Sequence, residues 1–193
     1  MINKKQLQEI KNFGIDLDWN ASFGGKSKGN KHLFRVVNIA KFLAEGEDVD
    51  ITIIEASAWL HDTNLEKTIT GSTLENKDKV MNFLEKINVS NEDIIKILHC
   101  IEAHDGRIKA KTLEAKIIHD ADTLEKTGPL GIIRETWKRA QLGWPTEKII
   151  EHLKTHLKKR EDNMYLKKAK IKAKKLNKEL DVFFKIINTQ LKE

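Results

Sequence analysis

The stretch ASAWLHDTNLEK, residues 56–67, contains both the end of an apolar helical pattern and a candidate functional pair. An apolar helical pattern runs up to Leu60, and a histidine and a carboxylate follow side by side at His61 and Asp62. Thr63-Asn64 then weakens the helical pattern. The His-Asp pair is therefore either half of a metal site or an ordinary polar helix end, and residues elsewhere in the chain bear on the choice.

Helical spacing of apolar residues extends over most of the chain. Residues 31–45 carry such a stripe, and a helix capped by Asp50 leads to His61. Further helices are predicted at 74–87, 91–104 with Ser90 or Asn91 as the cap, 112–126, 130–142, 146–160 and about 165–191, with Gly128-Pro129 and Gly143-Trp144-Pro145 separating the last three. No alternating strand pattern is present. The sequence thus predicts an all-α protein, a compact helical bundle without a sheet.

The chain of 193 residues is long enough to bury a substantial hydrophobic core. We expect a single helical domain over residues 1–193. Its metal-site core would occupy about 30–127, with C-terminal helices at about 130–193 packed on it.

Compartment and membrane association follow from composition. Cys100 is the one cysteine, so no intrachain disulfide can form, and the N-terminus lacks the order of a signal peptide. No apolar run reaches the roughly 18 to 20 residues that span a bilayer. These features predict a cytoplasmic protein without a membrane segment.

The formal charge of +6 is concentrated in one segment. Residues 154–178 hold eleven Lys or Arg against Glu161 and Asp162. Lysines around an apolar stripe are typical of a solvated helix face, and no interleaved aromatic residues favour base stacking. The sequence therefore argues against nucleic acid as the partner.

Four residues form the candidate metal site: His32, His61, Asp62 and Asp122. Each lies on or beside the apolar stripe of a predicted helix, and the separations allow other helices to come between the contributing ones. Imidazole and carboxylate groups from facing helices are how bundles hold divalent metals.

The order H…HD…D resembles the HD-domain superfamily of metal-dependent phosphohydrolases. LEAKIIHDADTLEKTGPLGI, residues 113–132, is similar to the aspartate-bearing helix of that family, with Ala121-Asp122 at its final ligand. Over nearly its full length, including the closing AKIKAKKLNKELDVFFKII, the chain resembles small stand-alone HD hydrolases, some of which are nucleotide pyrophosphohydrolases.

The resemblance implies that the four residues bind one divalent transition metal, Mn, Fe, Co, Ni or Zn, and it leaves a second metal open. Asp62 would also contact the attacking water. The implied reaction is hydrolysis of a phosphomonoester or pyrophosphate bond in a small phosphorylated substrate, with nucleotides the leading class. The chain would act as a monomer or a homodimer.

The residues beyond the ligands are less constrained. HD nucleotidases and alarmone hydrolases often have a Glu three places after the Asp of the HD pair, where this chain has Leu65. Glu66 is the catalytic candidate if the chain turns after the helix, and an exposed glutamate is the alternative. Lys67, His104 and Arg107 are candidate substrate contacts, with Arg134 a weaker one.

The remaining histidines have ordinary explanations. His119-Asp120 repeats the dipeptide, but Asp120 would face another side of its helix than Asp122, which favours a supporting or solvated role. His99 and His104 are five residues apart and do not share a helical face. His104, at the predicted helix end, is better placed than His99 as a substrate contact or accessory ligand, with a core or capping histidine as the alternative. His152 and His156 have metal-pair spacing but no accompanying Glu, so a solvated face is the better interpretation.

Two other functions stay open from the sequence. A cyclic-nucleotide or dinucleotide phosphodiesterase would gain support if His99 and His104 held a second metal. A non-catalytic module that binds a nucleotide or nucleic acid is the alternative outside enzymes.

Overall fold

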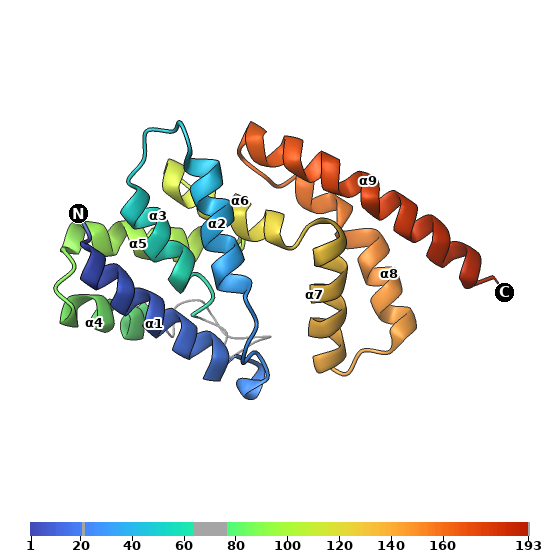
Figure 1. The fold of residues 1–193 in the computed structure, drawn as a ribbon, viewed down its shortest axis with the longest axis horizontal. Helices are drawn as coiled ribbons and strands as arrows, with labels where there is room; N and C mark the ends of the chain where they lie inside the picture. The colour runs from blue at the N-terminus through green and yellow to red at the C-terminus, as the bar shows by residue number, and fades with distance from the viewer. Residues whose placement is uncertain (21, 64–76, 193) are drawn as a thin grey trace. The chain divides into compact units, whose positions relative to one another are not determined.

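The computed structural model describes residues 1–20, 22–63 and 77–192. All regular structure in these residues is helical, which confirms the all-α prediction (Figure 1). The elements are α1 (Lys4–Asn20), the 3₁₀ turn η1 (Ser22–Gly25), α2 (His32–Ala44), α3 (Ile51–Leu60), α4 (Lys77–Lys86), α5 (Asn91–Ala103), α6 (Leu113–Glu125), α7 (Gly128–Gln141), α8 (Thr146–His156), the 3₁₀ turn η3 (Lys158–Glu161) and α9 (Lys167–Gln190).

The chain divides into two compact units, Met1–Ala121 and Asp122–Glu193. The division falls inside α6, which is one continuous helix from Leu113 to Glu125. That the two units make a single HD-type domain stays a prediction.

Helix α3 is the centre of the first unit. It contacts α1, α2 and α5 (Figure 1), and its residues from Ile53 to Leu60 are buried apart from Glu55. A helix that is apolar on all sides is stable in water only when other helices surround it. The fold therefore delivers the end of α3, and His61 with it, into the interior.

Side-chain caps fix where these helices begin. Asp50 Oδ1 accepts hydrogen bonds from the backbone N–H groups of Thr52 at 2.8 Å and Ile53 at 3.4 Å, which starts α3 as predicted. Ser90 Oγ accepts from the Asp93 N–H at 3.2 Å and starts α5, which settles the choice between Ser90 and Asn91. Each cap satisfies donors that the first helical turn leaves unpaired.

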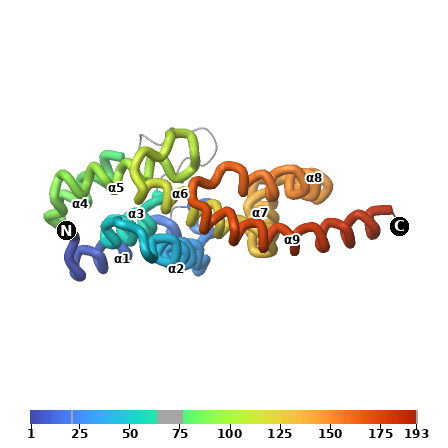
Figure 2. The backbone as a smooth tube through the Cα atoms, turned by 90° about the horizontal axis from the view of Figure 1, so that it is seen from above, coloured from blue at the N-terminus to red at the C-terminus, as the bar shows by residue number. Residues whose placement is uncertain are grey.

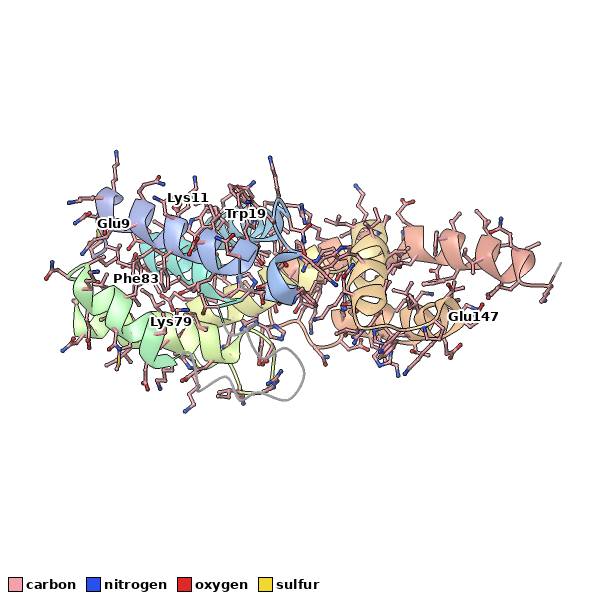
Figure 3. All side chains as sticks on the ribbon, turned by 90° about the horizontal axis from the view of Figure 1, so that it is seen from below. Glu9, Lys11, Trp19, Lys79, Phe83 and Glu147 are labelled. Atoms are coloured by element: carbon pink, nitrogen blue, oxygen red, sulfur yellow. The ribbon has the colours of Figure 1, made fainter. Side chains whose placement is uncertain are left out.

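The sequence did not predict α1. Its buried residues Ile10, Gly14 and Leu17 form a thin stripe among Gln, Asn and Lys, too sparse to stand out. Gly14 lies directly against α3, because a Cβ placed there would be 2.1 Å from the Trp59 carbonyl oxygen. On α4, Phe83, labelled in Figure 3, stacks on Phe13 of α1 with ring centroids 3.9 Å apart. Tertiary contacts thus make up for the weak local pattern.

In the second unit α7 contacts both α8 and α9, as the tube in Figure 2 shows. Its core cluster consists of Ile149, Leu153, Leu157, Leu180 and Phe184. The helix predicted at 146–160 ends at His156 and continues as the 3₁₀ turn η3, with Leu157 between them fully buried.

Helix α9 buries a narrower stripe than its sequence predicts. Leu180 and Phe184 are buried, but Leu191, expected on the same stripe, is 55% exposed just after the helix ends. Among the described residues no helix is both long and apolar enough to cross a membrane.

Candidate metal centre

The centre begins where α3 ends. His61 follows Leu60 at the helix terminus, and its side chain is fully buried. Thr63 closes the helix, since both its N–H, at 3.1 Å, and its hydroxyl, at 2.7 Å, donate to the Leu60 carbonyl. The predicted polar helix end is therefore present at Thr63, two residues after a fully buried histidine.

His32 is the first residue of α2 and is 3% exposed. Its Nε2 lies 3.0 Å from the Nε2 of His61, and the two rings meet edge to face with centroids 5.0 Å apart. The 3₁₀ turn η1 (Ser22–Gly25) precedes α2 in the chain.

Asp122 lies on α6, directly after Ala121, and is 2% exposed. One donor atom each from His32, His61 and Asp122 fall within 4.8 Å of one another. Among the residues that the structure describes, this is the group of three or more His, Cys, Asp or Glu with spacing suited to a metal ion. His61 lies 29 positions after His32 in the chain, and Asp122 lies 61 positions after His61. These three residues thus offer two nitrogens and an oxygen to one point.

Asp62 lies beside the same point with a side chain 10% exposed. Its Oδ2 is 3.0 Å from His32 Nε2 and 3.6 Å from His61 Nε2. The carboxylate is therefore next to both imidazoles, although it falls outside the group of three whose donor atoms all lie within 4.8 Å.

The hydrogen bonds of His61 show that this arrangement fits a metal. Its Nδ1 is 2.8 Å from the Ala58 carbonyl oxygen. A carbonyl only accepts, so Nδ1 carries the proton and the neutral ring has its lone pair on Nε2, which faces His32 and Asp62. Metal-ligating histidines have this tautomer, with the second nitrogen held by a backbone or carboxylate oxygen.

His104, at the end of α5, is oriented in the same way. Its Nδ1 lies 2.6 Å from the Ile101 carbonyl, and its Nε2 is 3.7 Å from Asp62 Oδ1. The ring meets His61 edge to face at 5.2 Å and is 7% exposed. The structure therefore places His104 at the centre and His99 away from it, since His99 Nε2 accepts the Lys111 N–H at 3.0 Å.

Sequence reasoning missed Lys126. Its ammonium lies 2.5 Å from Asp122 Oδ2, four residues along the chain. The (i, i+4) spacing of opposite charges was the available signal, but this lysine-rich chain contains many such spacings. This pair differs from the others because Asp122 is buried, and the attraction between opposite charges is stronger in a buried environment than in water.

Four other candidates were expected near the site. Glu66 and Lys67 lie outside the described residues. Arg107 has a side chain that is 67% exposed and pairs with Asp105 at 2.9 Å. Arg134 pairs with the buried Glu125 at 2.6 Å.

Asp120 is fully buried and is not solvated. Its Oδ1 lies 3.0 Å from His119 Nδ1, and His119 is itself 5% exposed. The second His-Asp pair of the sequence is thus an internal hydrogen-bonded pair.

These observations define the class of the protein: an all-helical fold with a buried His/His/Asp cluster, supplied by three helices, that could hold a metal ion. The chain belongs to the HD domain family, whose model matches residues 30–127. That range begins just before His32 and ends just after Lys126.

The fold is that of HD-superfamily hydrolases. A structure of an HD-superfamily hydrolase from Bacillus thuringiensis aligns with a TM-score of 0.76 and 24% identity, over 98% of both chains. The structure of YpgQ from Bacillus subtilis in complex with ADP aligns with a TM-score of 0.78 and 21% identity, over 96% of this chain and 95% of that one.

Two curated relatives match by sequence. YpgQ, an uncharacterized protein of Bacillus subtilis, is 30% identical over 112 residues, which is 53% of each chain. Ribonuclease Y from Syntrophomonas wolfei is 32% identical over 108 residues, which is 55% of this chain and 19% of that protein. The matches thus span about half the length of the first relative and a fifth of the second.

Proposed function

We propose that this protein is a metal-dependent phosphohydrolase that cleaves a phosphomonoester or pyrophosphate bond of a nucleotide with an activated water molecule. The observation that carries the proposal is the convergence of His32, His61 and Asp122 within 4.8 Å at buried positions. The family supports it, since the fold is that of HD-superfamily hydrolases.

We assign His32, His61, Asp62 and Asp122 as the residues that would hold one divalent ion. The set of two imidazoles and two carboxylates suits manganese, iron, cobalt, nickel or zinc. Such an ion, when bound, lowers the pKa of its water towards about 7 and polarises the phosphate. The group of His32, His61 and Asp122, whose donor atoms lie within 4.8 Å of one another, supports the binding of one ion at this point.

The protein side chains supply orientation and charge. The Nδ1–H bond to the Ala58 carbonyl holds His61 with its Nε2 lone pair facing inward. Asp62 lies between His32 and His104, where one oxygen can bind while the other accepts a proton from the attacking water. His104, 3.7 Å from Asp62, and Lys126, 2.5 Å from Asp122, could donate to a phosphate oxygen.

A nucleotide is the proposed substrate class because YpgQ, which shares the fold over nearly the whole chain, was crystallised with ADP. Phosphate groups need cationic or hydrogen-bonding partners, and Lys126 and His104 supply both beside Asp122 and Asp62.

The test is to strip the protein of metal and restore manganese, cobalt, nickel or zinc one at a time. Each form is assayed for phosphate or pyrophosphate release from nucleoside mono-, di- and triphosphates, with cyclic nucleotides as comparison. We expect activity with at least one metal and nucleotide, reduced at least 100-fold by Asp122→Asn and little changed by Asp48→Asn, an exposed carboxylate.

Activity that survives Asp122→Asn in full would contradict the proposal, as would the absence of release from every metal and nucleotide pair. Nucleotide binding without turnover would instead identify a non-catalytic binding module. Cleavage confined to cyclic nucleotides would identify a phosphodiesterase.

A further inference from the structure

The last turn of α6 carries Asp122 and leads into α7 within the second unit. Lys126, the first residue after α6, makes two separate contacts. Its ammonium lies 2.5 Å from Asp122 Oδ2, and its backbone carbonyl accepts a hydrogen bond from Arg160 Nη1. Carbonyls at the C-terminal end of a helix lack helical partners, and this bond supplies one. Lys126 is therefore tied to Asp122 through its side chain and to Arg160 through its backbone.

Arg160 belongs to the turn η3, and its side chain is 19% exposed. While Nη1 reaches the Lys126 carbonyl, Nη2 of the same guanidinium donates to Glu135 Oε1 at 2.7 Å. Glu135 lies on α7 and is 5% exposed. A guanidinium is planar and presents its N–H donors in a rigid fork. Two acceptors on two different segments of the chain thus fix the orientation of Arg160.

The surroundings of Arg160 and of the Lys126 carbonyl are closely packed. The turn η3 contacts both α8 and α9, and Leu157, directly before it, is fully buried in the core cluster. Asn177 of α9 donates to Glu161 Oε2 of η3 at 3.1 Å. On α7, a Cβ placed on Gly131 would lie 2.1 Å from the Lys126 carbonyl oxygen. The backbone at the end of α6 is therefore held from α7 and from η3.

We propose that Arg160 is a positioning residue of the metal centre. By holding the Lys126 backbone it fixes the end of α6, and with it the Asp122 carboxylate that the Lys126 ammonium contacts. The inference rests on the proposed function, because it requires Asp122 to bind a metal ion. Removal of a group that orients a metal ligand typically weakens metal binding by about 10- to 100-fold.

Arg139 provides a matched comparison for Arg160. Its Nε lies 3.2 Å from Glu135 Oε2, so both arginines pair with the same buried carboxylate. The hydrogen bond to the Lys126 carbonyl comes from Arg160. Removal of either arginine should therefore lower the melting temperature, because Glu135 loses a cation. A change in metal affinity should follow from the removal of Arg160 and not from that of Arg139.

The test is titration of Co²⁺ into the metal-free full chain, measured by calorimetry and by the visible absorption of the bound ion. We expect Arg160→Gln to weaken Co²⁺ binding at least tenfold and to change the visible spectrum, which reports the geometry of the ligands. Arg139→Gln should bind Co²⁺ within about threefold of the parent protein and with the same spectrum. Circular dichroism and the melting temperature establish that each variant is folded under the conditions of the titration.

A milder variant keeps the test decisive if Arg160→Gln does not fold. Arg160→Lys retains a cation beside the buried Glu135, but an ammonium lacks the planar fork that reaches two acceptors. We expect Arg160→Lys to bind Co²⁺ at least threefold more weakly than the parent protein.

The connection through Lys126 is tested by a double variant. Lys126→Met removes the contact with Asp122 and keeps the backbone carbonyl that Arg160 binds. In this background the further change caused by Arg160→Gln should be less than about threefold, because two groups that act through one contact are not additive.

Failure of this inference is distinguishable from failure of the metal centre. If the parent protein does not bind Co²⁺, the metal centre and the role of Arg160 are both wrong. If the parent protein binds Co²⁺ and Arg160→Gln and Arg139→Gln have equal effects, the role of Arg160 is overturned and the metal centre stands. A full tenfold loss from Arg160→Gln in the Lys126→Met background would also overturn it.

Discussion

The ring nitrogen that carries the proton determines whether His61 can bind a metal through Nε2. The Ala58 carbonyl takes the Nδ1–H bond at 2.8 Å, so the inward-facing Nε2 of the neutral ring carries a lone pair. His104 repeats the arrangement through the Ile101 carbonyl at 2.6 Å. Both histidines follow the last turn of a helix, α3 or α5, where backbone carbonyls lack helical partners. The end of α3, which the sequence predicted, thus orients His61 as a candidate metal ligand.

His104 is the residue whose proposed role is most easily separated from the metal. If it contacts the substrate phosphate, His104→Gln should raise KM and lower kcat/KM by about 10- to 100-fold, with the bound metal retained. His99→Gln is the matched control and should leave kinetics unchanged, because His99 binds the Lys111 N–H instead. Steady-state kinetics and metal analysis measure both. Loss of metal in His104→Gln would make it a ligand, and unchanged kinetics would remove it from the site.

Helix α1 is held in place by its contact with α3. In most exposed helices replacing Gly with Ala stabilises the helix by about 1 kcal/mol. At Gly14 the sign should reverse, since the new Cβ would fall 2.1 Å from the Trp59 carbonyl oxygen and force the helices apart. We expect Gly14→Ala to lower the free energy of unfolding by about 1 to 3 kcal/mol in urea titrations. Lys5→Ala, on the exposed side of α1, should change it by less than about 0.5 kcal/mol, and a stabilised Gly14→Ala variant would contradict this packing.

In the second unit Glu135 joins α7 to the segment after α8. Burial raises the pKa of this carboxyl, but Arg160, with Lys138 and Arg139, outweighs burial and lowers the pKa to about 2. The folded-state pKa is depressed, so the stabilisation is present above the unfolded value near 4.5 and is lost as pH falls towards 2. Glu135→Gln should therefore lower the free energy of unfolding at pH 7 by at most about 3 kcal/mol, with the difference shrinking below pH 4.5.

Urea unfolding at several pH values checks this expectation. Glu151→Gln, an exposed carboxylate on α8, is the control and should have little effect at any pH. A destabilisation by Glu135→Gln that is the same at pH 3 as at pH 7 would show that the charge of Glu135 does not supply the stability.

Helices with wide apolar stripes and their own caps were predictable from the sequence. Asp50 and Ser90 mark the starts of α3 and α5 through local hydrogen bonds that the sequence reveals. Helix α1 was not predictable, because its thin stripe gains its stability from contacts with α3 and α4 that are distant in the sequence.

At the scale of the whole molecule, the sequence predicted those residues of the candidate site that belong to an ordered motif along the chain. The H…HD…D order pointed to His32, His61 and Asp122, which the structure brings together. Lys126 follows no such pattern, and its importance comes from the burial of Asp122. Arg107 was proposed as a cation that could contact a phosphate, and its exposure and its pairing with Asp105 depend on a local geometry that the sequence does not specify.

The metal centre is tested most directly by calorimetric titration of manganese, cobalt or zinc into the metal-free protein, with Asp122→Asn and Asp48→Asn measured alongside. We expect one ion bound per chain in the parent protein and in Asp48→Asn, and affinity at least 100-fold weaker in Asp122→Asn, with all three proteins folded by circular dichroism. Equal affinity in the parent protein and Asp122→Asn, or no saturable binding of any of these metals, would contradict the assignment of His32, His61 and Asp122 as a metal centre.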